Sequence, residues 1–103
     1  MDETKLIPDS LLGIRLDLGC GKKKHDGAYG VDKFQLDGVD LVHDLICTPW
    51  PLPDNCAHTV YAISLWQEIP RGRIREFMSE LHRVAKPDAE VFLAGYYGHD
   101  WRF

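Results

Sequence analysis

The feature that most constrains the fold is a short apolar segment that ends in two glycines separated by one residue. Residues 14–18 (Ile-Arg-Leu-Asp-Leu) predict a β-strand, and Gly19 and Gly21 follow it directly, on either side of Cys20. Glycine has no Cβ and adopts positive φ, so such a loop turns tightly and lets a ligand approach its backbone N–H groups. The segment therefore predicts a strand that leads into a ligand-binding loop, with an ordinary turn as the alternative.

A second strand with an acidic end favours the ligand-binding interpretation. Residues 28–32 (Ala-Tyr-Gly-Val-Asp) predict this strand, and Asp32 stands at its tip. In α/β sheets that bind nucleosides, a carboxylate at this place accepts hydrogen bonds from the ribose hydroxyls. A plain turn role for Asp32 is the alternative, but its position downstream of the two glycines favours the ribose.

Four segments in this order resemble the motifs of the Rossmann-like (class I) S-adenosylmethionine-dependent methyltransferases, most closely their type 11-like branch. Residues 16–21 are similar to the first motif, residues 30–32 to the second, residues 42–45 (Val-His-Asp-Leu) to the third, and residues 81–87 to the corner before the fifth strand. The resemblance extends over nearly the whole chain, which would be a short or truncated form. It implies a cofactor, S-adenosylmethionine, and methyl transfer to an acceptor that the sequence does not identify.

The resemblance also implies which residues bind the cofactor. Asp32 would hold the ribose and Lys33 would lie over the adenine. Asp44 would accept a hydrogen bond from the exocyclic amine, and Leu45 would pack beside the ring. Asp17 is expected to order the glycine loop through backbone hydrogen bonds. The full expected set comprises Asp17, Gly19, Cys20, Gly21, Asp32, Lys33, Asp44, Leu45 and Ser64.

The segment after the fourth predicted strand departs from the family pattern. Many members carry His-x-x-Glu-His there, whereas residues 64–70 read Ser-Leu-Trp-Gln-Glu-Ile-Pro. No catalytic residue is assigned, and Glu68 is either a general base or an exposed loop residue. Two functions therefore stay open: a methyltransferase, or a non-catalytic module that retains the methyltransferase fold and either binds S-adenosylmethionine or serves as a partner subunit. A nicotinamide-dependent enzyme is disfavoured because no Gly-x-Gly-x-x-Gly motif is present.

The remaining segments predict an α/β fold. Residues 39–43, 59–63 and 90–96 predict strands, and three prolines exclude a regular helix from residues 45–57. Residues 71–85 predict a helix, because apolar side chains recur at i, i+3, i+4 and i+7; they are Ile74, Phe77, Met78, Leu81 and Val84. The predicted architecture is a Rossmann-like parallel sheet of about five strands in the order 3-2-1-4-5, forming one methyltransferase-like domain over residues 1–103.

Two connections are too short for the usual crossover helices. Residues 22–27 and 33–38 each join neighbouring parallel strands, a step that normally takes a dozen residues or more. We therefore expect reduced helix cover on one face of the sheet, and a homo-oligomer or a partner chain over that face. The lysines at 22–24 are either a binding site for the cofactor's carboxylate or solvated surface.

Composition excludes several other classes of protein. The formal net charge of −4 disfavours a general nucleic-acid-backbone binder. The chain has no apolar run long enough for a membrane span and no signal-peptide pattern, which favours a cytoplasmic protein without a membrane partner. The three cysteines form no Cys-x-x-Cys pair, so no metal site or disulfide framework is expected.

Overall fold

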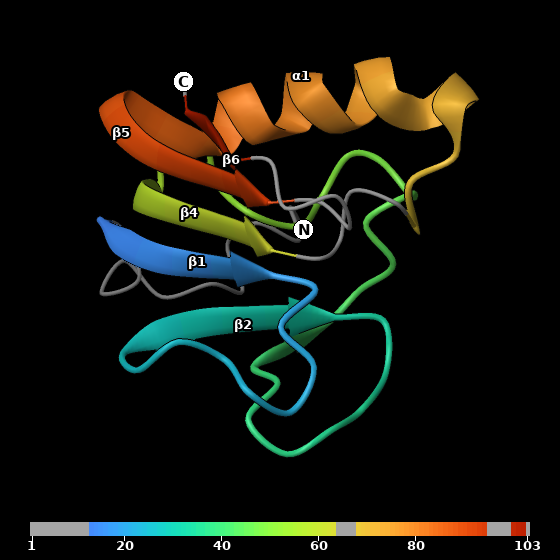
Figure 1. Cartoon of the computed structure of the whole chain (residues 1–103), viewed down its shortest axis with the longest axis vertical. Coiled ribbons are helices and arrows are strands. Elements are labelled where there is room, and N and C mark those ends of the chain that lie inside the picture. Colours follow the sequence, from blue (N-terminus) through green and yellow to red (C-terminus); the bar gives the residue numbers. More distant parts are fainter. Residues whose placement is uncertain (1–12, 64–67, 95–99, 103) are drawn as a thin grey trace.

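The strands form one sheet in the predicted order. The computed structural model describes residues 13–63, 68–94 and 100–102. The sheet order is β3-β2-β1-β4-β5-β6, with β1 to β5 parallel and β6 antiparallel to β5 (Figure 1). The parallel part therefore confirms a Rossmann-like α/β sheet in the order 3-2-1-4-5. The strands are β1 (Ile14–Leu18), β2 (Ala28–Asp32), β3 (Leu41–Val42), β4 (Ala57–Ile63), β5 (Ala85–Ala94) and β6 (Asp100–Arg102).

The bounds of β3 and β5 differ from the predicted ones, and β6 was not predicted. β3 has two residues, and β5 begins at Ala85, directly after the helix. The register between β4 and β5 shifts near the start of β5: Ala57 pairs with Ala85, whereas Thr59 pairs with Glu90. The intervening corner contains Asp88 at a φ of 68°, a conformation that non-glycine residues rarely adopt. The corner therefore turns on an aspartate rather than on a glycine.

A single α-helix is present within the described residues, and it packs against one face of the sheet. This helix, α1 (Ile74–Val84), follows a short 3₁₀ turn at Arg71–Arg73 and runs alongside the strands near β5 (Figure 1). Its buried apolar side chains, Phe77, Leu81 and Val84, join the same core cluster as Leu16 and Val60 of the sheet.

The loop between β3 and β4 completes this cover. The side chains of Trp50 and Leu52 are both 1% exposed. The Trp50 ring meets Phe77 edge-on, with centroids 5.3 Å apart, and its Nε1 donates a hydrogen bond to the Leu45 carbonyl at 2.9 Å. Leu16, Leu18 and Val31 lie in the same cluster at 0% exposure. On this side of the sheet, a loop therefore supplies cover that the missing helices would otherwise give.

An arginine on α1 fixes this loop to the helix. The Arg83 guanidinium donates to both carboxylate oxygens of Glu80, at 2.7 and 2.9 Å, and to the carbonyls of Leu52 and Trp50, at 2.7 and 3.0 Å. Trp50 N donates to Glu80 Oε1 at 2.6 Å, and Asp54 Oδ1 accepts from Arg83 at 2.8 Å. The hydrogen bonds from Arg83 outweigh burial and lower the pKa of the Glu80 carboxyl. These hydrogen bonds hold the loop and α1 together.

The opposite face carries a polar cluster in place of a helix. Asp17, Tyr61 and Phe92 share this face, because they are paired across β1, β4 and β5. His25 stacks on Tyr61 with ring centroids 3.8 Å apart, and its N and Nδ1 lie 2.8 and 2.9 Å from Oδ2 of the buried Asp17. Neither short connection contains a helix, as predicted. The connection at residues 22–27 instead lies against the sheet through His25.

Candidate functional site

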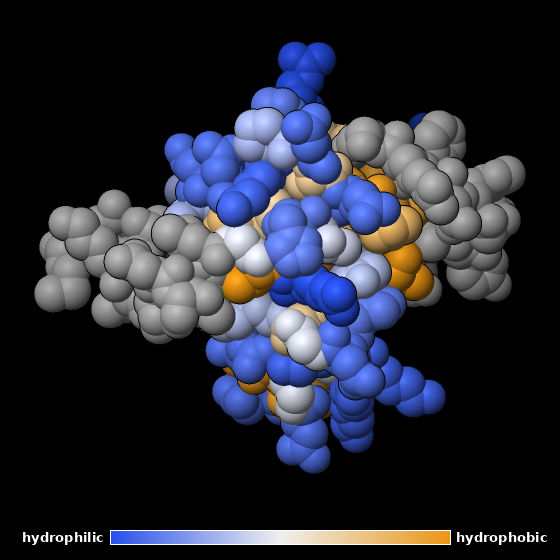
Figure 2. Space-filling view, turned by 90° about the vertical axis from the view of Figure 1, so that its left-hand side faces the viewer, coloured by the Kyte–Doolittle hydropathy of each residue, from blue (hydrophilic) through white to orange (hydrophobic). Residues whose placement is uncertain are grey.

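A cavity of about 370 Å³ opens at the carboxyl ends of the strands. Its walls come from the loop after β1, the end of β2, the segment after β3, the end of β4 and the segment before α1. Ligands bind at this edge in open α/β sheets. The opposite edge, where the parallel strands begin, is mostly hydrophilic over its described surface (Figure 2). The cavity is lined by Gly19, Gly21, Asp32, Lys33, Phe34, Leu36, His43, Asp44, Leu45, Ile46, Ile63, Glu68 and Ile69.

The glycine loop forms one wall of the cavity. Gly19 and Gly21 have φ of 68° and 58°, so both positions need glycine. A Cβ at Gly21 would meet no atom within 4 Å, which shows that the space beside it is open. The backbone N–H groups are not free, however. Those of Gly19 and Cys20 donate to the Val31 carbonyl, at 2.7 and 3.2 Å, and that of Gly21 donates to Asp32. The expectation that these N–H groups face a ligand was wrong. The loop instead leaves open space in which a ligand could lie against its backbone.

Asp32 is held in place at the centre of the site. Its Oδ2 accepts from Gly21 N at 2.9 Å and its Oδ1 from Phe34 N at 3.0 Å. A carboxylate has about four acceptor positions, so both oxygens keep capacity for a hydroxyl of a ligand. The two backbone bonds fix the carboxylate between the ends of β1 and β2.

The third wall follows β3. Asp44 Oδ1 accepts from Ile46 N at 3.1 Å, and no described residue donates to Oδ2. His43 Nε2 lies 2.8 Å from the Cys47 carbonyl, which tightens the same turn. Leu45 is buried beneath the cavity. This wall therefore offers one carboxylate oxygen next to an apolar surface.

An exposed aromatic residue at the rim was missed by the sequence analysis. Phe34 is 60% exposed, and Lys33 Nζ lies 5.3 Å from its ring centroid. Exposed large apolar side chains beside a cavity are typical of ligand contacts. Ile63 and Ile69 were likewise not assigned, because they follow no motif, whereas Glu68, considered as a general base, also lines the cavity. The available signal for Phe34 was an aromatic residue two positions after Asp32, the acidic end of β2.

The structure brings six of the nine expected cofactor residues into this cavity. Asp17 lies on the polar face with His25, so it orders the segment after the glycine loop. The Cys20 side chain points toward β2, since a Cβ at Gly30 would lie 2.7 Å from its Sγ; burial raises the pKa of this thiol to about 11. Ser64 lies outside the described residues. The six are Gly19, Gly21, Asp32, Lys33, Asp44 and Leu45.

The lysine run contributes to the fold at one position. Lys24 Nζ lies 2.7 Å from Asp40 Oδ2, which also accepts from Gly30 N at 2.8 Å. Burial opposes ionisation of Asp40, but the hydrogen bonds from Lys24 and Gly30 outweigh it and lower the pKa of the carboxyl. Lys24 is therefore engaged away from the cavity, while Lys22 and Lys23 are exposed.

The arrangement suits a ligand with hydroxyl groups and a flat apolar part. The carboxylates of Asp32 and Asp44 share the cavity with apolar side chains from four segments, within a volume typical of small-molecule sites. In the described part of the chain, no group of three or more His, Cys, Asp or Glu side chains could hold a metal ion. The described segments also contain no helix long and apolar enough to cross a membrane.

Comparison with known proteins adds no family to this description. No family model matches the chain, and no curated protein matches it in sequence.

Proposed function

We propose that this chain binds S-adenosylmethionine in the cavity at the ends of β1, β2 and β3 and transfers its methyl group to an acceptor. One observation carries the proposal: residues from three separate strand ends, expected from motif order to hold this cofactor, line a single cavity. These residues are Gly19 and Gly21 after β1, Asp32 on β2, and Asp44 after β3.

The residues present fit the chemical groups of the cofactor. The remaining acceptor positions of Asp32 suit the two ribose hydroxyls. Asp44 Oδ2 suits the exocyclic amine of adenine, and Leu45 and Phe34 offer apolar surface for the ring. The open space at Gly21 lets the ligand lie against the backbone. When bound, the cofactor supplies the sulfonium methyl, and the chain contributes mainly position and orientation.

Calorimetric titration with S-adenosylmethionine and S-adenosylhomocysteine tests binding. We expect Asp32→Ala to weaken binding by roughly 1.5–3 kcal/mol, because it removes charge-assisted hydrogen bonds. Since Asp32 also anchors Gly21, Asp44→Ala is a second variant that leaves the glycine loop intact. Asp37→Ala is the matched control, because Asp37 is exposed on the same connection and does not line the cavity. If both cavity variants bind like the parent, the assignment is wrong.

Methyl transfer needs a separate measurement. A panel of small-molecule, protein and nucleic-acid acceptors with methyl-labelled cofactor would detect it. Label transferred by the parent and lost in Asp32→Ala supports the enzyme. Tight binding with no transfer to any acceptor supports the non-catalytic module instead.

A further inference from the structure

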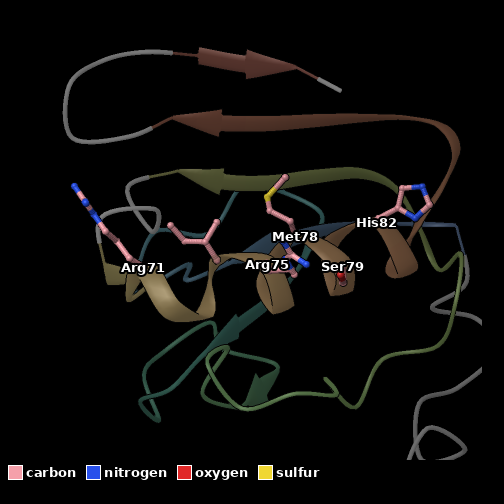
Figure 3. Close-up of a pocket in the computed structure, with 6 residues that line it drawn as sticks. Arg71, Arg75, Met78, Ser79 and His82 are labelled. Atoms are coloured by element: carbon pink, nitrogen blue, oxygen red, sulfur yellow. The ribbon is translucent and has the colours of Figure 1, made fainter.

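A shallow groove of about 830 Å³ runs along α1, away from the cavity. Its lining residues recur every three or four positions, so they form one stripe along the helix. Figure 3 shows Arg71, Met78 and His82 projecting from successive parts of this segment. The lining residues are Arg71, Ile74, Arg75, Met78, Ser79 and His82, which we call the α1 groove.

The apolar part of the α1 groove belongs to the stripe of apolar side chains that packs against the core. Five apolar side chains form that stripe, and three of them, Phe77, Leu81 and Val84, are buried. Ile74 and Met78 are only partly buried, at the flank of the core. They therefore present apolar surface one helical turn apart, which suits two apolar side chains of another segment.

The arginines of the α1 groove are not ion-paired within the described structure. Arg71 and Arg75 are exposed, and neither forms an ion pair with a described residue. Arg83, by contrast, is fully engaged by Glu80 and Asp54. The protein as a whole carries a net charge of −4, so this positive patch is a local feature.

The placement of these arginines is unfavourable for the isolated helix. Arg71 and Arg75 are four positions apart, where like charges repel. Arg75 also stands in the first turn of α1, where the helix dipole favours negative charge, and Arg71 lies in the 3₁₀ turn just before it. An acidic binding partner would offset both effects.

We propose that the α1 groove binds an acidic amphipathic helix of a partner protein. Its apolar side chains, spaced i and i+4, would cover Ile74 and Met78, and its carboxylates would pair with Arg71 and Arg75. A nucleic acid is disfavoured, because its phosphate backbone gains nothing from the apolar floor and is repelled by the net negative charge. This surface is independent of the proposed cofactor site.

Fluorescence anisotropy with a labelled synthetic peptide tests the proposal. The probe is a helical peptide of about 15 residues, with leucines at i, i+4 spacing and glutamates on both sides. We expect saturable binding that weakens at high salt, and a loss of affinity of about tenfold or more in the double variant Arg71→Glu, Arg75→Glu. Met78→Glu should weaken binding in the same way.

Three controls decide the outcome. Arg15→Glu removes an exposed arginine on β1, outside the groove, and should bind the peptide like the parent. Unchanged circular dichroism and cofactor titration would show that the groove variants remain folded. Equal binding of the parent and the double variant, equal binding of a sequence-scrambled peptide, or tighter binding of a single-stranded oligonucleotide would overturn the proposal.

Discussion

The two faces of the sheet are stabilised in different ways. On one face, α1 and the loop around Trp50 bury Leu16, Leu18 and Val31 completely. On the other face, a single histidine stacks on Tyr61 and bonds to the buried Asp17. A short chain has few apolar residues to distribute, so one face takes a packed core and the other takes a small hydrogen-bonded cluster. The missing crossover helices are thus replaced by a loop on one side and by His25 on the other.

The largest effect is expected in the packed core. Phe77→Ala should lower the free energy of unfolding by about 3–5 kcal/mol, because it leaves a cavity beside Trp50. Urea denaturation would measure this loss. Phe34→Ala is the control, since Phe34 is mostly exposed and its loss should change stability by about 0.5 kcal/mol or less. Equal effects at the two positions would contradict the difference between core and rim.

The Arg83 network should show the next largest effect. Arg83→Met removes the donors that hold Glu80, Leu52 and Trp50, and we expect it to cost about 2–4 kcal/mol in urea denaturation. Arg75→Met is the control. It removes an exposed arginine of the same helix that takes no part in this network, and it should change the free energy of unfolding by about 0.5 kcal/mol or less. A small effect of Arg83→Met would mean that the loop is held by apolar packing alone.

The same network predicts a pH dependence. The pKa of Glu80 is lowered in the folded chain. Its stabilising contribution is therefore present above the ordinary glutamate pKa, about 4.3, and is lost as pH falls through the lowered folded value. We expect Glu80→Gln to be less stable than the parent at pH 7, by about 1.5–3 kcal/mol, and the difference to shrink in acid. A difference that is constant from pH 7 to pH 3 would contradict this.

The polar face should be less sensitive to substitution. His25→Ala removes the stack on Tyr61 and the hydrogen bond between the ring and Asp17, and it should cost about 1–2 kcal/mol. Asp26→Ala, at an exposed neighbour in the same connection, is the matched control. Thermal denaturation of both variants would show whether His25 fixes this connection or merely lies on it.

Self-association through this polar face is the smallest expected effect. The apolar side chains of β1 and β2, such as Leu16 and Val31, are buried on the other face of the sheet. Half-buried Tyr61 and exposed Ile63 remain as apolar contacts on the polar face. Weak, concentration-dependent association is therefore the prediction. Sedimentation equilibrium over a wide concentration range tests it, and a monomer throughout would contradict it.

The sequence predicted those parts of the fold that depend on neighbouring residues. β1 and β2 have their predicted bounds, because glycines and an aspartate end two apolar segments. The helix periodicity located α1 to within a few residues. The bounds of β3 and the existence of β6 depend on partners distant in the chain, such as Asp40 bonding Gly30 N, so the sequence predicted β3 as too long and did not predict β6.

The residues of the candidate site were likewise predicted only in part. The order of the motifs predicted that Gly21, Asp32 and Asp44 belong to one site. This was possible because a glycine and two aspartates can be recognised from the sequence alone. The motif order did not predict that Asp32 and Val31 engage the N–H groups of the glycine loop, since these bonds form only when β1 and β2 are adjacent. It also missed Phe34, whose position at the rim depends on where the connection after β2 turns.

The shortness of β3 has a consequence for how copies of this protein meet. An outermost strand offers unpaired N–H and C=O groups that invite another chain to add a strand, which is a route to aggregation. β3 offers only two residues for such pairing. Beside it, Asp40 and Lys24 place a charge pair at the same border, and burying that pair under a foreign strand would be costly. This edge of the sheet is therefore poorly suited to pairing with a strand of another copy, which disfavours aggregation through strand addition.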